Sequence, residues 1–419
     1  MAGYFVRFEC QCTLAMAMHK WILCCGGSGM HSFFAACVEQ KTRATMQVVV
    51  PVTDDGGSSL AIVEAFGGPS VGDLRNVMLA IASAVWTEAV RRHALPQAES
   101  MVQRLRFLRR RLEGPDPRAE LAELIAQDES FSPTQRDALD RLRRYCQPSS
   151  VYHRCNLENA SVGNLLLFTL IADAVADETV EGPVRAACAT FLTTLCGLTA
   201  DVMSTVCADL RISVVPALDL IRSGPSVPLV GQTARLPTVS LQAVLDGGER
   251  LLGQRVISYG PQSLHTGYHV HKDTLCDPLR SSVDSLMIVA GSTTTLTYAA
   301  SPLVITDSTV LIIGRGSLLT SSLAAVSAVR TQLKVRDVFL LINSTRDRET
   351  SFLGTTVDYI SFVRRIVGTD LRYVGVVAAN SHFDCGVDDT CVKVRAIPGG
   401  AFCDGALVQC LQELTVRTS

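Results

Sequence analysis

Two kinds of hydrophobic pattern alternate along this chain. Short runs rich in Val, Ile and Leu end in Gly, Asp or Ser, and between them lie longer segments whose apolar residues recur with the period of a helix. The strands are predicted at residues 21–25, 47–53, 212–216, 286–290, 309–313, 338–343 and 373–378, with a hairpin region at 227–230 and 256–259. The helices are predicted at residues 30–40, 77–85, 161–176, 321–335 and 357–367, and after Ala406. Strands that alternate with helices predict an α/β protein with a Rossmann-like, three-layer, mostly parallel sheet.

The stretch from residue 91 to residue 144 has a different composition. It contains 12 Arg and 9 acidic residues, and Gly and Pro interrupt it at 114–117. This pattern predicts two or three solvated amphipathic helices, which we assign to a helical insertion or cap at 91–150 beside an α/β domain formed by 20–90 and 151–419. A basic arm that binds nucleic acid is the alternative. It is disfavoured because acidic residues alternate with the arginines and few aromatic residues are available for stacking.

Composition excludes several classes of protein. Of the 419 residues, 47% are hydrophobic, and the net charge is -2, so we expect a folded protein that binds neither nucleic acid nor membrane. Thr169 and Asp173 interrupt the longest apolar run, which is too short for a membrane span. The N-terminus lacks the features of a secretory signal, and the 15 cysteines contain no CxxC pair, which together indicate a cytoplasmic, reducing location.

Two loops near the N-terminus contain residues that suit a phosphorylated ligand. The sequence GGSG at 26–29 follows the first predicted strand and opens a helix, where backbone N–H groups and the helix dipole favour a phosphate. Asp54 and Asp55 follow the next strand and should lie at the same carboxyl edge of the sheet, where they could hold Mg²⁺ or accept a proton from a hydroxyl. A structural tight turn explains GGSG equally well, and a helix cap is the alternative role for either aspartate.

Three further loops follow the same logic. GDLRN at 72–76 precedes an apolar helix, and there Asp73 could be only an N-cap and Arg75 only a surface ion-pair partner. SVGN at 161–164 also opens an apolar helix. GRGSLLTSS at 314–322 follows a predicted strand and places hydroxyl groups beside a glycine turn. Five such loops together favour a ligand site more strongly than any one of them does.

These motifs, in this order, resemble the CofD/YvcK family, also called UPF0052. The resemblance rests on GGSG at 26–29, TDDGGSS at 53–59, GDLRN at 72–76, SVGNLLL at 161–167 and IGRGSLLTSSL at 313–323, and it extends to about residue 350. TDDGGSS followed by GDLRN is the most specific part. The insertion at 91–144 and the sequence AFGGP at 65–69 resemble eukaryotic members of the family.

The resemblance implies one of two functions. The CofD branch contains 2-phospho-L-lactate transferases, which move phospholactate from a guanosine diphosphate carrier to a deazaflavin alcohol with Mg²⁺ and release GMP. The YvcK branch binds a nucleotide sugar such as UDP-N-acetylglucosamine and regulates carbon metabolism without catalysing a reaction. The resemblance therefore predicts a GDP- or UDP-type ligand and Mg²⁺, leaves open whether the protein is an enzyme, and is compatible with a homodimer.

The resemblance also assigns roles to residues at matching positions. Asp54 and Asp55 would be the catalytic and metal-binding pair. Arg315 differs from the family, which usually has Pro there, and it adds a charge that could either bind a phosphate or narrow the site. The nucleotide and its phosphates would be bound by Gly26, Gly27, Ser28, Gly29, Asp73, Arg75, Asn76, Asn164, Gly314, Arg315, Gly316, Ser317, Thr320 and Ser321.

Overall fold

The computed structural model describes the N-terminal half of the chain and the strands of the C-terminal half. The described residues are 19–26, 30–52, 54, 58–66, 69–127, 131–147, 155–217, 219–221, 229–230, 256–257, 269–270, 285–289, 309–314, 337–343, 371–378, 393–398 and 408. The helices predicted at 321–335 and 357–367 lie outside this set, as does all of the closing helix except Val408.

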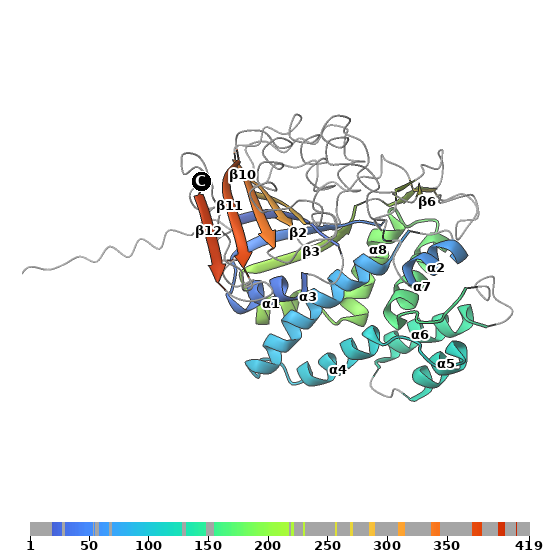
Figure 1. Ribbon diagram of the computed structural model, residues 1–419. Helices are drawn as coiled ribbons and strands as arrows, with labels where there is room; N and C mark the ends of the chain where they lie inside the picture. The colour runs from blue at the N-terminus through green and yellow to red at the C-terminus, as the bar shows by residue number, and fades with distance from the viewer. Residues whose placement is uncertain are drawn as a thin grey trace, which may run out of the picture.

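Eight parallel strands form the central sheet. Their order is β12-β11-β10-β9-β8-β1-β2-β3, so the chain builds outward from β1 in one direction and then returns to build outward in the other. This is the doubly wound arrangement, with its topological switch point between β1 and β8 (Figure 1). The strands are β1 (His19–Cys24), β2 (Ala44–Val50), β3 (Leu210–Pro216), β8 (Ser285–Val289), β9 (Thr309–Gly314), β10 (Asp337–Asn343), β11 (Leu371–Ala378) and β12 (Lys393–Pro398). The predicted α/β fold with a Rossmann-like, mainly parallel sheet is confirmed.

Two short antiparallel pairs accompany this sheet. β5 (Leu229–Val230) pairs with β6 (Val256–Ile257), which confirms the hairpin region predicted for these residues. β4 (Leu220–Ile221) pairs with β7 (His269–Val270), and the sequence pattern did not predict this pair. Both pairs come from the part of the chain between β3 and β8.

The described helices are concentrated in the N-terminal half. Figure 1 shows α1 and α3 against the sheet and α4, α5 and α6 on the side of α3 that is farther from it. The helices are α1 (His31–Glu39), α2 (Ser58–Phe66), α3 (Gly72–Arg91), α4 (Ala98–Arg109), α5 (Pro117–Gln127), α6 (Pro133–Tyr145), α7 (Val162–Ala176), α8 (Pro183–Thr190) and α9 (Ala200–Val206), with a π-helical turn, η3 (Phe191–Leu195), after α8.

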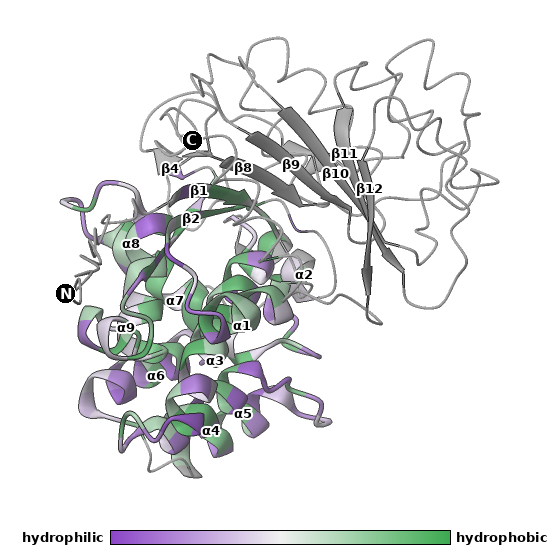
Figure 2. Cartoon of the chain, turned by 90° about the vertical axis from the view of Figure 1, so that its left-hand side faces the viewer, coloured by the Kyte–Doolittle hydropathy of each residue, from purple (hydrophilic) through white to green (hydrophobic). Residues whose placement is uncertain are grey.

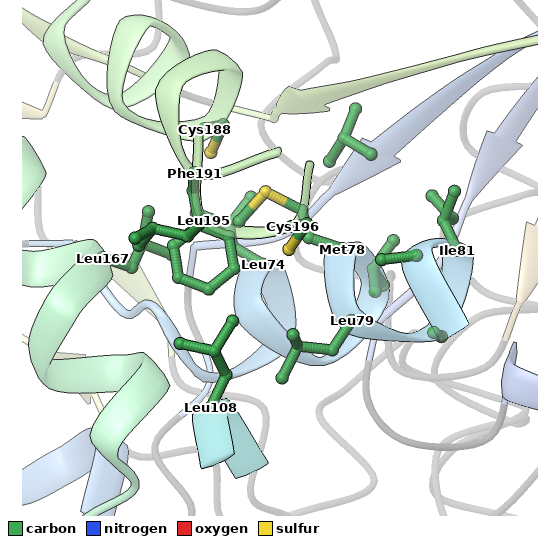
Figure 3. Packing of buried hydrophobic residues seen from close by; sticks show 14 of the residues in the cluster. Leu74, Met78, Leu79, Ile81, Leu108, Leu167, Cys188, Phe191, Leu195 and Cys196 are labelled. Carbon is green, nitrogen blue, oxygen red and sulfur yellow. The ribbon is translucent and has the colours of Figure 1, made fainter. Parts of the chain in front are cut away.

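Helix α3 is the centre of the helical layer. It packs on α1, α4, α7 and α9, and 16 of its 20 residues are buried, which explains why a helix of this length has apolar residues on nearly every face. Figure 3 shows Leu74, Met78 and Leu79 of α3 in one cluster with Leu108 at the end of α4 and Leu167 of α7. The segment that follows residue 91 therefore shares the core of the rest of the protein.

The arginine-rich segment forms three helices, α4, α5 and α6. Helix α6 begins with Pro133 at its first turn and with a capping box, in which the Ser132 backbone N–H donates to the Gln135 side chain at 2.9 Å. Figure 2 shows the apolar sides of these helices turned toward α3 and their polar sides turned outward. The division into an α/β domain and a helical cap stays a prediction.

Several element boundaries differ from those predicted. Helix α3 begins at Gly72, so Asp73 lies inside its first turn and is not its N-cap, and the helix is much longer than 77–85. Helix α2 begins at Ser58 inside a segment read as a loop, and β2 ends at Val50. Strand β12 was not predicted. Helices α2 and α3 thus extend over polar and glycine residues that locally favour turns.

Within the described part of the chain, no single helix has the length and apolarity of a membrane span. One bent pair, Pro183–Leu195 with Ala200–Val206, meets the criterion on length and composition alone.

Candidate functional site

The candidate site lies where parallel strands end. Gly26 follows β1, Asp54 follows β2, and Gly314 is the last residue of β9. Because all strands of the sheet run in one direction, these three residues lie at the same carboxyl edge. β1 is also one of the two strands at the topological switch point, where open α/β sheets bind their ligands.

Glycines allow two carboxylates to approach the backbone closely at this edge. A Cβ atom at Gly26 would collide with the carboxylate of Asp73, and a Cβ atom at Gly72 would collide with Asp54 and Ser59. The hydroxyl of Ser59 donates a hydrogen bond of 2.6 Å to Oδ2 of Asp54. The start of α3 is thus enclosed by the ends of β1 and β2 and by the first turn of α2.

Arg75 and Asn164 connect three helices at the same place. Nε of Arg75 donates to Oδ1 of Asn164 at 2.9 Å, and Nδ2 of Asn164 donates to Oγ of Ser58 at 3.4 Å. The two side chains come from positions 89 residues apart, in the first turns of α3 and α7, and Ser58 opens α2. Only 6% of Arg75 and 1% of Asn164 are exposed. Three helix N-termini, each with unsatisfied N–H groups, therefore meet around one buried guanidinium.

Neighbouring charges at the site both raise and lower the pKa of Arg75. Burial is the largest of the effects that lower the pKa of Arg75, and the charges of Arg111 and Arg109 act in the same direction, whereas those of Asp54 and Asp73 raise it; together they bring the pKa to about 10. The guanidinium remains positive at neutral pH. A buried cation with one hydrogen bond among the described residues, from Nε, keeps its terminal N–H groups available to an anion.

The structure places part of the predicted set and leaves the rest undescribed. It brings Gly26, Asp54, Asp73, Arg75 and Asn164 together, with half-buried Asn76 next to Arg75 and Gly314 at the same edge of the sheet. The predicted residues that lie outside the described ones are Gly27, Ser28, Gly29, Asp55, Arg315, Gly316, Ser317, Thr320 and Ser321.

Sequence reasoning missed two hydroxyl groups near the site. Ser58 and Ser59 contact Asn164 and Asp54, and their position inside the TDDGGSS motif was the available signal. The side-chain amide of Asn164, which was predicted to contact the ligand, accepts a hydrogen bond from Arg75 and donates one to Ser58, an arrangement that fixes the orientation of the Arg75 guanidinium. The binding roles themselves stay predictions.

Asp54 supplies the kind of oxygen that Mg²⁺ prefers. It is a half-buried carboxylate at the sheet edge, with the hydroxyl of Ser59 beside it. Among the described residues, no group of three or more His, Cys, Asp or Glu side chains forms a metal site. Mg²⁺ commonly binds proteins through one or two carboxylates and completes its shell with water and substrate phosphates, so this donor set fits a metal that arrives with its ligand.

The doubly wound sheet, with a buried polar cluster at its carboxyl edge, defines an α/β protein of the Rossmann-like class. Residues 22–192 match the family described as 2-phospho-L-lactate transferase CofD, and this segment belongs to that family. The match includes the first four motifs of the resemblance and ends before the glycine-serine loop that begins at Gly314.

Two crystal structures of a UPF0052-family protein from Bacillus halodurans are similar to the chain. One has 16% sequence identity, covers 88% of this chain and 83% of that chain, and has a TM-score of 0.38. The other has 15% identity, covers 95% of this chain and 99% of that chain, and has a TM-score of 0.40. A comparison with curated proteins gives no match.

Proposed function

We propose that the protein is a CofD-like transferase that moves a phosphorylated group from a nucleoside-diphosphate donor to an alcohol. The observation that carries this proposal is the guanidinium of Arg75, nine-tenths buried where α2, α3 and α7 begin and next to Asp54 and Asp73. Helix N-termini and a desolvated cation both favour phosphate oxygens. The family match of residues 22–192 supports the same reaction class.

In the proposed reaction, the residues at the carboxyl edge of the sheet have two tasks, which are to neutralise charge on the phosphates and to activate the alcohol. The oxygen of the acceptor alcohol forms a bond to the phosphorus of the donor, the bridging P–O bond breaks, and the nucleoside monophosphate leaves with that electron pair. Arg75 would neutralise charge on the phosphate oxygens. Asp54 and Asp55 would take the proton of the alcohol or hold a metal, and the other residues would keep the two reactants in line.

Mg²⁺ bound at Asp54 and Asp55 would supply further positive charge to the diphosphate. Ser59 would then orient the Asp54 carboxylate through the hydrogen bond of 2.6 Å. Gly27, Ser28, Gly29 and the loop with Gly314, Arg315, Gly316, Ser317, Thr320 and Ser321 would hold the remainder of the nucleotide.

The second candidate function is that of a YvcK-like regulatory protein that binds a nucleotide sugar without reacting. Burial of both ends of the Asn164 amide and of the Arg75 stem is compatible with it, since a rigid phosphate cradle serves binding as well as catalysis. The difference lies in whether an acceptor alcohol reacts at the bound phosphate.

A ligand screen followed by a product assay distinguishes these functions. Purified protein is heated with GMP, GDP, GTP, UDP, UDP-N-acetylglucosamine or a deazaflavin, each with and without Mg²⁺. A ligand at about 100 times its Kd stabilises the fold by about 2.7 kcal/mol. Stabilisation by a guanosine diphosphate compound that requires Mg²⁺ supports the transferase, and release of GMP in the presence of an alcohol acceptor then establishes it.

The contrary results are equally clear. A response confined to the uridine sugar and indifferent to Mg²⁺ supports the regulatory protein. No response to any nucleotide contradicts both functions. Thr169→Val is a control for nonspecific effects of a substitution in α7. It removes a buried hydroxyl that donates to the carbonyl of Leu165 in the same helix, and the variant should be stabilised by the same ligands as the wild type.

A further inference from the structure

The loop that leaves α4 brings arginines toward Arg75. The backbone N–H of Leu112 donates to the carbonyl of Ala160, and the N–H of Val162 donates to the carbonyl of Arg110, at 2.9 and 3.0 Å. Arg111 forms a β-bridge with Ser161 in the antiparallel sense. Residues 110–112 are thereby fixed along the segment that immediately precedes α7 and its first-turn residue Asn164.

Gly163 shows how close this loop lies to the candidate site. A Cβ atom on Gly163 would be 2.6 Å from the carbonyl oxygen of Leu108 and 3.1 Å from Cγ of Arg75. The end of α4 and the stem of Arg75 therefore meet at one point, with only a glycine between them. Figure 3 shows the side chain of Leu108 packed toward Leu74, the residue before Arg75.

Two arginines of this loop are held by backbone carbonyls. NH2 of Arg109 donates to the carbonyl of Leu79, one turn after Arg75 on α3, at 3.0 Å. NH1 of Arg111 donates to the carbonyl of Asn159 at 2.8 Å. Among the described residues neither of them forms an ion pair, whereas Arg110 between them lies 3.7 Å from Glu120.

The charges of these arginines reach the site. The charges of Arg111 and Arg109 both act to lower the pKa of Arg75, and the charge of Arg109 also acts to lower the pKa of His31 at the start of α1. Like charges gathered at the edge of a partly desolvated site repel one another until an anion binds between them. Among the described residues whose charges act on one another here, the guanidinium groups of Arg75, Arg109 and Arg111 outnumber the carboxylates of Asp54 and Asp73.

We propose that Arg109 and Arg111 form, together with Arg75, a cationic subsite for a second phosphate group of the ligand. The segment at 91–150 is then part of the binding site, and it selects a diphosphate over a monophosphate. Guanidinium groups suit this task because each presents two parallel N–H groups to phosphate oxygens. The inference rests on the proposed function for the identity of the ligand, but its test uses inorganic anions and needs no nucleotide.

Calorimetric titration with inorganic pyrophosphate and with inorganic phosphate tests the subsite. The wild type should bind pyrophosphate about tenfold or more tightly than phosphate, because a second set of charge-assisted hydrogen bonds is made. Arg109→Gln and Arg111→Gln should each lower the affinity for pyrophosphate about fivefold and leave the affinity for phosphate nearly unchanged. Arg109→Lys, which keeps the charge, should recover part of the loss.

Arg110→Gln is the matched control, since it removes the same charge from the same loop on the side that faces Glu120. It should bind pyrophosphate like the wild type. Equal affinities of the wild type for the two anions, or equal losses in the Arg110 and Arg111 variants, would overturn the subsite. If nucleotides fail to bind but pyrophosphate still binds more tightly than phosphate, the proposed function fails and the subsite stands. If nucleotides bind but the two anions bind equally, the subsite fails and the proposed function stands.

Discussion

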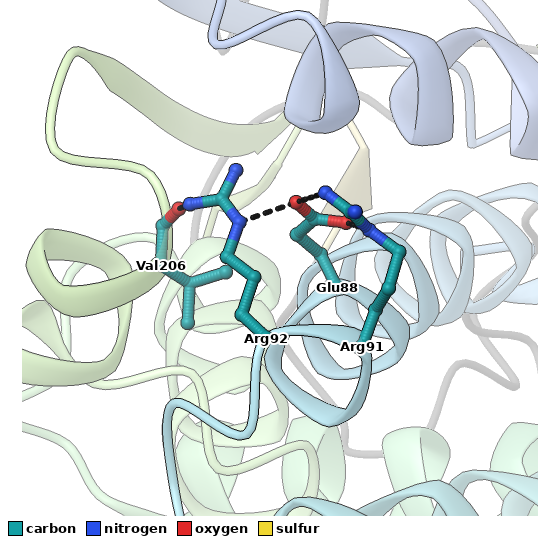
Figure 4. Close-up of polar contacts among 4 residues, drawn as sticks. All are labelled: Glu88, Arg91, Arg92 and Val206. Carbon is teal, nitrogen blue, oxygen red and sulfur yellow. Dashed lines mark hydrogen bonds and ion pairs between the residues drawn. The ribbon is translucent and has the colours of Figure 1, made fainter.

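At the carboxyl end of α3, Glu88 is 5% exposed and its carboxylate is fully engaged by two arginines of the same helix end. Arg91 reaches it through Nε and NH2, each at 2.6 Å, and Arg92 adds a third hydrogen bond through Nε (Figure 4). Arg92 also donates to the carbonyl of Val206 at 3.1 Å, which ties α3 to the end of α9. This network joins elements, and its central carboxylate is satisfied by protein groups.

At the amino end of the same helix, Arg75 is buried to a similar degree but has a different set of partners. Its one hydrogen bond within the described residues runs from Nε to Asn164, and the nearby cations Arg109 and Arg111 oppose its charge. Burying a cation in this way costs solvation free energy, and the interactions with the protein groups around it offset only part of that cost.

The comparison separates two uses of a buried charge. A charge whose hydrogen bonds are completed by the protein stabilises one arrangement of helices, and its loss should appear in the unfolding free energy. A buried charge whose hydrogen bonds are not all made by the protein can make the remaining ones to a ligand, and its loss should appear in the affinity for that ligand. The following substitutions test this distinction at the two ends of α3.

The largest effect is expected for Arg75→Met. The variant keeps a long apolar stem but loses the charge, so affinity for pyrophosphate should fall about 100-fold, the equivalent of about 2.7 kcal/mol. Stability without ligand should be equal or higher, because an incompletely paired buried cation has been removed. Titration calorimetry and thermal unfolding measure the two quantities. A variant that unfolds more easily yet binds normally would show that Arg75 is structural.

Glu88→Gln should give the opposite result. Loss of the carboxylate charge weakens bonds to two arginines that are partly solvated, so the free energy of unfolding should fall by about 2 kcal/mol while anion affinity is unchanged. The arginines lower the pKa of Glu88, so its contribution is present above the ordinary value of 4.5 and is lost as pH falls through the lowered pKa. Denaturant unfolding at several pH values should show a steeper loss of stability toward acid pH in the wild type than in the variant, and the difference is the contribution of Glu88.

Much of the sheet was predictable from the sequence because most of its strands are short, continuous apolar runs. The run at 21–25 is continuous and apolar, and residues 309–313 and 338–343 have the same character, as interior parallel strands do. β12 was missed because it lies at the edge of the sheet, where Lys393 and Arg395 alternate with apolar residues and a proline ends the strand.

The site was predictable only where a local motif marks it. Gly26, Asp54, Asp73 and Arg75 belong to loops whose glycines and charges stand out in the sequence. The hydrogen bond from Arg75 to Asn164 spans 89 positions, and no local pattern specifies it. Arg109 lies in a segment whose charges looked uniformly solvated, and only the pairing of 110–112 with 159–162 brings that segment to the site.

A smaller effect is expected for Asn164→Ala. This variant tests whether Asn164 contacts the anion itself or only orients the Arg75 guanidinium. Arg75 would keep its charge and lose the acceptor that fixes its guanidinium, so affinity for pyrophosphate should fall about tenfold. Asn164→Asp should restore orientation, because a carboxylate also accepts from Nε, although its charge would weaken binding of an anion. Thr169→Val on the same helix is the control. A loss in Asn164→Ala as large as that in Arg75→Met would mean that Asn164 itself contacts the anion.

The smallest effect, and the one most specific to Arg75, should be a change of affinity at high pH. Burial and the charges of the neighbouring arginines lower the pKa of Arg75 to about 10, so the empty site begins to lose its charge near that pH, whereas a bound anion favours the charged form. Because pyrophosphate itself loses a proton in this pH range, the affinity is compared with that of Arg75→Met, and the ratio of the two affinities should be nearly constant up to about pH 9.5 and should fall about threefold by about pH 10.5.

Unfolding supplies the second measurement of the same shift. Above about pH 10 the folded chain loses the Arg75 proton before the unfolded chain does, so Arg75 makes the folded state relatively more stable as pH rises from there. The difference in unfolding free energy between the wild type and Arg75→Met should move in that direction, since other titrating groups cancel in the comparison. A difference that is independent of pH, together with an affinity that does not fall, would show that the anion is bound by groups other than the buried guanidinium.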